Sequence, residues 1–358
     1  MKILAIDTAT DETSAAVTEN HSVLSNIVWS QASLHAEFGG VYPTLAQRQH
    51  RERIDFVIQK ALKQAGVTIK DIDAVAVTIG PGLAVALEVG ISKAKDLAMA
   101  NNKPLVPVNH VEGHVQSPLA QPKGKKSHTD IQFPAIAIVL SGGTSQIILV
   151  ENIGEYEILV STVDDTLGEA LDKGARALGL GYPGGPVLEK VAKEGTTDSF
   201  PLPIPMIGRE KEYILSYSGL KTALVRTIDS IKGKEKINKK TIVDLAATYQ
   251  NVAFKHFTKV LERVVLDKQN TIEVKTILLG GGVGANAELR KRIRRIARSC
   301  NLNLYFPYSK KLFTDNAAMI GVAGYYNYKR GIYTNNKFDK IDRVPRLKIT
   351  DDITQLYS

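Results

Sequence analysis

Two histidines spaced four residues apart are the strongest indication of chemistry in this sequence. His110 and His114 lie in the run NHVEGH, which directly follows a short apolar run. Residues at i and i+4 lie on one face of a helix about one turn apart, so both imidazoles could bind one divalent ion. A pair of partly buried histidines without a ligand is the alternative that this spacing alone leaves open.

A third ligand would complete such a site, and Asp315 in the run FTDNA is the best candidate. It lies where a predicted strand gives way to a predicted helix, a position at which an aspartate can also cap the helix by accepting backbone N–H bonds. Two imidazoles and one carboxylate leave coordination positions open for substrate oxygens, as catalytic metal sites do. The sequence therefore predicts a metal site at His110, His114 and Asp315, with the capping role as the alternative for Asp315.

The spacing after the first histidine argues against a metalloprotease. In the protease motif HExxH, a glutamate directly follows the first histidine and reaches the metal-bound water. Here Glu112 stands two positions after His110, roughly 200° around a helix, so its carboxylate should point away from the metal.

Three glycine-rich runs together predict a nucleotide cleft. They are SGGTS at 141–145, PGGP at 183–186 and GGGVGAN at 280–286, each expected after a strand. Glycine lets backbone N–H groups approach a phosphate, and a following helix N-terminus adds a favourable dipole. Each run by itself could be a structural turn. The motif GxxxxGK[ST] does not occur in the sequence, so a nucleotide would be held by loops of this kind.

The composition is typical of an intracellular protein of one large or two medium domains. The 358 residues are 44% hydrophobic, carry a formal net charge of +9 and include a single cysteine, Cys300, which cannot form an internal disulfide. Asp7 interrupts the apolar start of the chain, where a signal peptide needs an unbroken run. The longest apolar runs fall far short of the roughly 20 residues that span a bilayer. We expect a cytoplasmic protein without a membrane segment, and the positive charge favours a polyanionic partner.

The elements that must position these residues repeat one order twice. In the first half, we expect strands at 2–9, 14–19, 23–30, 74–80 and 104–108 and helices at about 43–64, at about 85–100 and from 110 onward. In the second half, we expect strands at 133–143, 145–151, 156–162, 276–282 and 302–307, helices up to 185, a larger helical block at about 214–265, and helices from 286 and from 315. Each half therefore has the order β-β-β-α-β-α-β-α.

This repeat predicts an α/β fold with the duplicated architecture of actin-like ATPases and sugar kinases (ASKHA). Two lobes would surround a nucleotide cleft, with a helical insertion in the second lobe. We place the N-terminal lobe at 1–128, the C-terminal lobe at 129–332, and a C-terminal extension without an assigned role at 333–358.

Nine segments in the correct order give the chain a resemblance to the TsaD family of enzymes that form threonylcarbamoyladenosine in tRNA. The segments are IDTATDETSAAV, HAEFGGVYPTLAQRQH, IGPGLAVALEVG, VNHVEGHV, VLSGGTSQI, DDTLGEALDKGARALGLGYPGGP, YSGLKTAL, GGGVGANAELR and FTDNAAMIGVAG. The resemblance extends from Ile3 to about Gly331. It implies a metal-dependent transferase that moves a threonylcarbamoyl group from threonylcarbamoyl-AMP to the N6 amine of the adenosine 3′ to the anticodon in ANN-decoding tRNAs, releasing AMP.

The resemblance also implies roles for individual residues. His110, His114 and Asp315 would bind one divalent ion, with Fe²⁺ expected first and Zn²⁺ as the alternative. The adenylate would be held by residues of the glycine loops and their neighbours, which are Ser141, Gly142, Gly143, Thr144, Ser145, Asp172, Gly185, Glu189 and Asn286. Asp172 looks like an acceptor for a ribose hydroxyl, and Asp11 and Glu12 match an acidic pair near the cleft that we take as candidate catalytic residues. The anticodon loop of tRNA and the proteins TsaB and TsaE are the implied partners, with TsaB expected to dock on the N-terminal half.

The sequence departs from the family pattern at several positions. The usual SGGHT reads SGGTS, so Thr144 replaces a histidine; Glu189 stands where the family often has aspartate; and the usual GLxGSL reads GLAVAL at 82–87. These changes affect the expected substrate contacts more than the metal ligands. An ATPase or kinase of the same architecture and a non-catalytic scaffold are the competing hypotheses, and the two histidines favour the transferase because such kinases hold Mg²⁺ through carboxylates and water.

Overall fold

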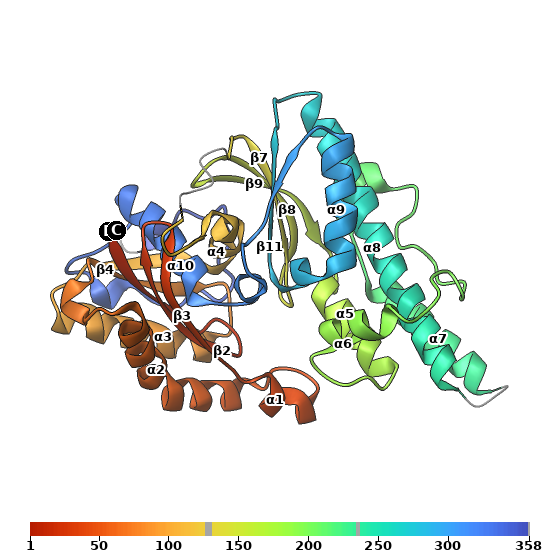
Figure 1. Cartoon of the computed structure of the whole chain (residues 1–358), viewed down its shortest axis with the longest axis horizontal. Helices are drawn as coiled ribbons and strands as arrows, with labels where there is room; N and C mark the ends of the chain where they lie inside the picture. The colour runs from red at the N-terminus through yellow and green to blue at the C-terminus, as the bar shows by residue number, and fades with distance from the viewer. Residues whose placement is uncertain (126–130, 234–236, 357–358) are drawn as a thin grey trace.

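Two lobes of similar construction make up the protein, each built on a six-stranded sheet (Figure 1). The computed structural model describes residues 1–125, 131–233 and 237–356. The first sheet has the strand order β5-β4-β1-β2-β3-β6, and the second has the order β12-β11-β7-β8-β9-β10 when it is read in the same direction. The strands are β1 Lys2–Asp7, β2 Glu12–Glu19, β3 Ser22–Ser30, β4 Ala74–Gly80, β5 Leu105–Asn109, β6 Gln121–Pro122, β7 Ala135–Leu140, β8 Ser145–Asn152, β9 Glu155–Thr162, β10 Ile214–Leu215, β11 Thr276–Gly280 and β12 Asn303–Tyr305.

Pairing directions also match between the two sheets. In each, three consecutive strands form an antiparallel meander, and the first of them pairs in parallel with a later strand. Each meander ends against a short parallel strand, β6 in the first lobe and β10 in the second. The predicted duplication is therefore confirmed, including its β-β-β start.

Helices cover both faces of both sheets, which is why the central strands read as almost continuous apolar runs. The helices are α1 Ala32–His35, α2 Pro43–Ala65, α3 Ala84–Ala100, α4 His110–Gln116, α5 Leu167–Ala177, α6 Gly184–Ala192, α7 Ser218–Lys232, α8 Lys239–Gln269, α9 Ala287–Ser299 and α10 Ala317–Lys329. On β1, Leu4 and Ile6 face the core shared with α2 and α3, and Ile3 and Ala5 face the core shared with α10, as the two-residue period of a strand requires.

The two lobes exchange helices at their interface. Helix α4 follows β5 of the first sheet, but its Val111 and Val115 pack against the second sheet. Helix α10 follows β12 of the second sheet, but it packs against β1, β2 and β5 of the first. The two helices also contact each other, and Gly113 permits this approach because a Cβ there would lie 2.9 Å from Ile320 Cδ1. Figure 1 shows both helices between the sheets. Residues about 200 positions apart in sequence are thereby brought together.

Most predicted elements are confirmed, with three corrections. The PGGP run does not follow a strand; it follows α5, and α6 begins at Gly184 with Pro183 before it. The helical block predicted from residue 214 begins instead with β10, because Ile214 and Leu215 extend the edge of the second sheet, and its helices are α7 and α8. Helix α10 begins at Ala317 rather than at residue 315. The predicted lobe boundary at residue 128 lies outside the described residues.

The segment after α10 returns to the first lobe as an irregular strap. Thr334 pairs with Leu105 at the edge of the first sheet, and the N–H of Val344 donates to the carbonyl of Ile79 at 2.7 Å. The contact is so close that a Cβ on Gly80 would lie 1.9 Å from the Val344 carbonyl oxygen. In the ranges that the structure describes, no helix is both long and apolar enough to cross a membrane.

Candidate active site

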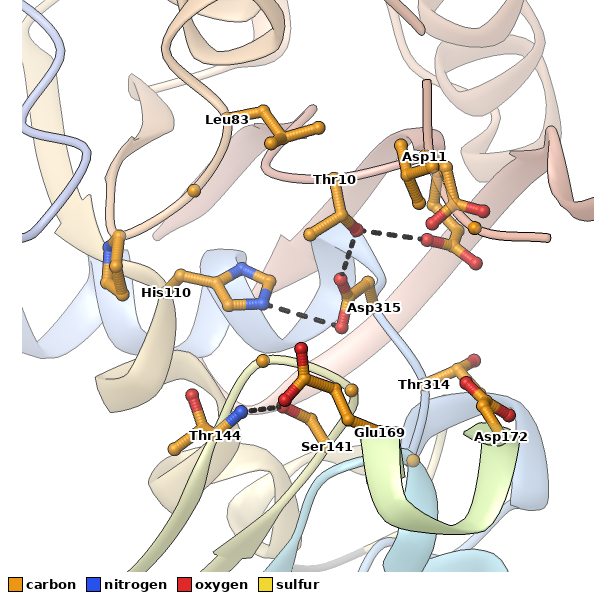
Figure 2. A pocket seen from close by; sticks show the side chains of 18 of the residues that line it. Thr10, Asp11, Leu83, His110, Ser141, Thr144, Glu169, Asp172, Thr314 and Asp315 are labelled. Atoms are coloured by element: carbon orange, nitrogen blue, oxygen red, sulfur yellow. Dashed lines mark hydrogen bonds and ion pairs between the residues drawn. The ribbon is translucent and has the colours of Figure 1, made fainter. Parts of the chain in front are cut away.

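A cleft of about 780 Å³ lies between the lobes. The first lobe lines it with Thr10, Asp11, Glu12, Gly39, Gly40, Val41, Pro81, Gly82, Leu83 and His110. The second half of the chain adds Ser141, Gly142, Gly143, Thr144, Glu169, Asp172, Lys173, Arg176, Tyr182, Gly282, Thr314, Asp315 and Pro345. Figure 2 shows Thr10 and His110 close to Asp315, with Ser141, Thr144 and Glu169 on the facing wall.

Helix α4 presents both predicted histidine ligands. The helix starts where β5 ends, and the Asn109 side chain caps it by accepting the N–H groups of Val111 and Glu112 at 2.8 and 3.2 Å. The imidazole rings of His110 and His114 lie 4.8 Å apart, nearly perpendicular to each other at 85°. The i, i+4 spacing therefore brings both rings to one face of the helix, as predicted.

Asp315 completes the set from the segment before α10. Its Oδ1 lies 3.4 Å from His110 Nε2 and 3.2 Å from His114 Nε2. One ligand atom from each of the three residues can be chosen so that all lie within 4.8 Å of one another. The capping alternative for Asp315 is wrong, because Asn316 caps α10 by accepting the Met319 N–H at 3.2 Å. The predicted three residues converge in the fold.

Burial and charge act against each other at this cluster. Burial lowers the pKa of His110, but the carboxylates of Asp315 and Asp7 outweigh it and hold that pKa well above its usual value. Burial likewise raises the pKa of Asp315, yet the two imidazoles hold it well below the usual value. Burial dominates at His114 and lowers its pKa. The carboxylate of Asp315 therefore favours the charged form and is available as a ligand.

Unpartnered buried atoms around the cluster fit a bound cation. His114 Nδ1 and Asp7 Oδ2 are buried and have no hydrogen-bond partner among the described residues. Asp7 Oδ1 lies 3.5 Å from His110 Nδ1, which is beyond a good hydrogen bond. Asp7 Oδ1 also accepts the Ala9 N–H at 3.3 Å, so only Oδ2 lacks a donor, and a buried charged oxygen without a donor is costly unless nearby positive charge compensates it. Two imidazoles and a carboxylate also suit a divalent transition metal, so the donor set fits the expected ion.

Thr10 links the candidate ligand to the acidic pair Asp11 and Glu12, where the loop after β1 enters β2. Its hydroxyl lies 2.7 Å from Asp315 Oδ2 and 3.3 Å from Glu12 Oε2. Burial raises the pKa of Asp11 and, together with the charges of Asp11 and Asp315, raises that of Glu12 well above its usual value. The two predicted acidic residues thus lie at the cleft, where protonation of one favours ionisation of the other.

The SGGTS loop after β7 forms the opposite wall. The Thr144 N–H donates to Ser141 Oγ at 3.1 Å, and Gly142 and Gly143 are exposed with open space where a Cβ would lie. Ser145 differs from the prediction: it is buried, does not line the cleft, and its hydroxyl accepts the Leu167 N–H at 2.8 Å. Four of the five predicted loop residues therefore line the cleft, and the fifth ties the loop to α5.

Asp172 and Gly185 meet at the start of α6. Asp172 Oδ1 accepts the N–H groups of Gly184 and Gly185 at 2.7 and 2.9 Å. Burial nevertheless raises the pKa of this carboxyl above its usual value. Asp172 lines the cleft, whereas Gly185 is not one of the residues that line it. The carboxylate expected for a ribose hydroxyl thus also caps a helix.

Glu189 and Asn286 serve the start of α9 and do not line the cleft. Glu189 Oε1 accepts the Ala287 N–H at 2.9 Å. Asn286 Oδ1 accepts the N–H groups of Glu288 and Leu289 at 3.0 and 3.2 Å, and its Nδ2 donates to Gln250 at 3.0 Å. Both side chains are therefore engaged as acceptors at the N-terminus of α9, and the adenylate contacts expected of Glu189 and Asn286 stay a prediction.

Several cleft residues were missed from sequence. Thr10 bonds to a residue 305 positions away, and Pro345 arrives from the C-terminal strap. Neither has a local signal in the sequence. Lys173 and Arg176 of α5 line the same cleft, and the i, i+4 spacing of Arg176 from Asp172 would have been a usable signal.

Glu112 points away from the two histidines, as predicted. It is buried on the far side of α4, where Tyr156 Oη donates to it at 2.9 Å and Arg330 Nη1 lies 3.2 Å away. Glu112 therefore does not occupy the position that the glutamate of HExxH holds in a metalloprotease.

Comparison with known proteins gives one consistent result. A family model described as "TsaD: tRNA N6-adenosine threonylcarbamoyltransferase" matches residues 22–322. A protein of that name from Thermosipho africanus is 41% identical over 98% of this chain and 100% of its own length, and one from Persephonella marina is 42% identical over 92% and 91%. The first alignment takes in most of residues 333–358.

Among solved structures, full-length HypF in its phosphate- and nucleotide-bound form is similar in fold. The TM-score is 0.56 at 15% identity, over 92% of this chain and 46% of HypF. HypF from T. kodakarensis gives a TM-score of 0.55 over 92% of this chain and 48% of that one, again at 15% identity. These likenesses confirm the predicted ASKHA fold class.

Proposed function

The chain belongs to the tRNA N6-adenosine threonylcarbamoyltransferase family. From that premise, we propose that the protein binds threonylcarbamoyl-AMP in its cleft and transfers the threonylcarbamoyl group to the adenosine 3′ to the anticodon of ANN-decoding tRNAs. The N6 nitrogen forms a bond to the carbamoyl carbon, the bond from that carbon to the phosphate oxygen breaks, AMP leaves, and N6 loses a proton. The observation that carries the proposal is the convergence of His110, His114 and Asp315 at a cleft whose opposite wall is an open glycine loop.

We propose that His110, His114 and Asp315 hold one divalent ion, Fe²⁺ in the first instance and Zn²⁺ as the alternative. When bound there, such an ion supplies a Lewis acid for donor oxygens. The softness of two imidazoles supports a transition metal over Mg²⁺. Thr10 holds the second oxygen of Asp315, which fixes the orientation of the carboxylate.

The remaining cleft residues bind and orient the substrates in this proposal. Backbone N–H groups of Gly142 and Gly143 face the donor phosphate, and Asp172 takes a ribose hydroxyl through the oxygen that does not cap α6. Gly185, Glu189 and Asn286 shape the adenylate end by fixing the starts of α6 and α9, and Ser145 fixes the loop. Asp11 and Glu12 are candidates to accept the proton lost by N6, since raised pKa values suit that step near neutral pH.

Partners and lobes follow from the same premise. We propose that TsaB docks on the first lobe, that TsaE joins the assembly, and that the lobes divide as 1–128 and 129–332 with the strap as a third segment. The substrate is tRNA, so the protein should work in the cytoplasm. The strap contributes Pro345 to the cleft and hydrogen bonds to Gly82, which assigns a structural role to residues whose role the sequence left open.

The testing experiment measures threonylcarbamoyl transfer to unmodified tRNA with an ANN anticodon, with partner proteins and Fe²⁺ or Zn²⁺ present. His110→Ala and Asp315→Ala should abolish transfer and lower the amount of bound metal while the proteins stay folded. His21→Ala is a matched control, because His21 contacts Tyr326 outside the cleft and should leave transfer unchanged. Activity in both ligand variants equal to wild type would contradict the metal site.

The competing hypotheses make different predictions in the same assay. A kinase or ATPase would consume ATP without modifying tRNA and would not need the histidines. A non-catalytic scaffold would show no transfer and no bound metal in the wild type. Neither outcome is compatible with the proposed reaction.

A further inference from the structure

Two exposed aromatic side chains stand at the rim of the cleft. Phe38 and Tyr42 are 56% and 50% exposed, and their rings stack on each other with centroids 5.1 Å apart at 18°. The three residues between them, Gly39, Gly40 and Val41, line the cleft. Because the rings stack nearly parallel and half or more of each residue is exposed, the pair offers an aromatic platform beside the entrance.

Buried polar contacts anchor the loop that carries this platform. The Tyr42 N–H donates to His35 Nδ1 at 3.2 Å, so His35 is neutral and its Nε2–H donates to Gln31 Oε1 at 3.1 Å. His50, next to Gln31, lies with its Nε2 at 3.0 Å from the Thr10 carbonyl. A platform on an anchored loop loses little conformational freedom when it binds a ligand.

A guanidinium group from the other lobe lies against the same loop. Arg176 of α5 is exposed, lines the cleft, and makes no hydrogen bond or ion pair with any residue in the described ranges. Its Cζ lies 3.1 Å from the position of a Cβ on Gly39, which has φ +65°. Glycine at this position therefore provides both the backbone turn and the space for the guanidinium.

A platform of aromatic faces beside an unpaired arginine fits single-stranded nucleic acid better than a protein surface. Aromatic rings stack on unpaired bases of any type, and arginine binds the phosphates between them. If the cleft takes an adenosine from the anticodon loop, the neighbouring nucleotides must lie at its rim. The formal charge of +9 also favours a polyanion.

We propose that Phe38 and Tyr42 stack on unpaired anticodon-loop bases next to the target adenosine, and that Arg176 contacts the adjoining phosphate. This inference rests on the proposed function and adds a binding site for the RNA outside the reaction centre. The residues position the RNA and take no part in bond making.

The test measures the affinity of the full-length chain for an anticodon stem–loop RNA by fluorescence anisotropy. Phe38→Leu and Tyr42→Leu keep an apolar side chain but lose the flat face, and each should weaken binding about 5- to 150-fold for the loss of one stacked base. Phe38→Tyr and Tyr42→Phe should bind as the wild type does. Arg176→Gln should weaken binding and reduce its dependence on salt.

The matched control is Phe56→Leu. Phe56 on α2 is also 56% exposed but does not line the cleft, so its loss should leave RNA affinity unchanged. The second arm uses a stem–loop with an abasic position beside the target adenosine. The wild type should bind this RNA more weakly than the intact stem–loop. The Leu variants should bind the two RNAs with equal affinity, because they have already lost the stacking contact.

Unchanged RNA affinity in both Leu variants overturns the inference, as does absence of any RNA binding by the wild type. If the Leu variants lose affinity for a partner protein but retain RNA affinity, the platform is a protein interface and the inference is also wrong. Transfer assays separate this result from the proposed function. If the wild type is active and the Leu variants keep its activity and its KM for tRNA, only the stacking site is refuted. If the wild type is inactive, the transferase proposal is refuted.

Discussion

Replacement of Thr10 by valine should weaken metal binding although Thr10 is not one of the proposed ligands. Valine keeps the branched shape of threonine and removes only the hydroxyl that lies 2.7 Å from Asp315 Oδ2. The side chain of Asp315 is 15% exposed, so water cannot readily replace the lost donor. The carboxylate should then rotate more freely and present Oδ1 less often to the two histidines.

The size of the effect follows from the charge on the acceptor. A hydrogen bond to a charged group contributes about 1.5–3 kcal/mol. At about 1.4 kcal/mol per factor of ten, this range equals roughly a 10- to 100-fold loss of metal affinity, which is also the usual range when a residue behind a metal ligand is removed. The free energy of unfolding should change by less than about 1 kcal/mol because the shape of the side chain is kept.

Titration of metal-free protein with Co²⁺, followed by visible absorption in the presence of a competing chelator, measures this affinity directly. Thr314→Val is the matched control: Thr314 also lines the cleft and adjoins Asp315, but its hydroxyl makes no hydrogen bond with the described residues. Co²⁺ affinity in Thr10→Val within about twofold of both wild type and control would refute the reasoning, since about 0.4 kcal/mol is too little for a charged hydrogen bond.

Three further changes test how the fold supports the site. Gly280→Ala places a Cβ 2.1 Å from the His114 carbonyl oxygen; it should lower the free energy of unfolding by about 1–3 kcal/mol and weaken Co²⁺ binding, because the backbone of α4 must move. Glu112→Gln removes a buried charge paired with Arg330 and should lower the free energy of unfolding by about 1–3 kcal/mol in urea denaturation. Burial lowers the pKa of His256 to about 4 despite the nearby charges of Asp164 and Glu210. At acidic pH this histidine therefore binds a proton more readily in the unfolded protein than in the folded one. The free energy of unfolding should fall by about 2–3 kcal/mol between pH 6.5 and pH 4.

Each of these predictions has a discriminating control. Gly219→Ala, at a position with open space around it, should not destabilise the protein. A Glu112→Gln variant as stable as wild type would show that the buried ion pair contributes nothing net. His256→Gln keeps an acceptor for the Ser216 N–H but cannot titrate, so its stability should depend less on pH than that of the wild type; identical pH profiles would contradict the assignment.

The sequence alone determined the elements and the candidate ligands. Short apolar or alternating runs predicted the strands, and the central strands are apolar throughout because helices cover both of their faces. The i, i+4 spacing of His110 and His114 placed both rings on one helical face, because helix geometry is local. The repeated element order led to the duplicated fold, and the family resemblance led to the transferase activity.

Helix capping could not be read reliably from the same local patterns. Asp315 and Asn316 both suit a cap, and only the backbone conformation decides that Asn316 has this role. Glu189 and Asn286 are engaged with the start of α9, and Ser145 with the start of α5. A polar residue near a glycine loop can bind a ligand or satisfy a helix end, and the choice depends on which N–H groups the fold leaves without partners.

Tertiary structure decided how the two lobes share the site. The exchange of α4 and α10 brings His114 to Asp315 across 201 positions, and the β1 loop brings Thr10 to the same carboxylate across 305. The strap adds Pro345, and the meeting of α5 with the loop at Gly39 places Arg176 beside the aromatic platform. Contacts of this kind arise from packing between distant segments. They leave no periodic pattern in one sequence, because each partner is chosen by where the other element lies in space.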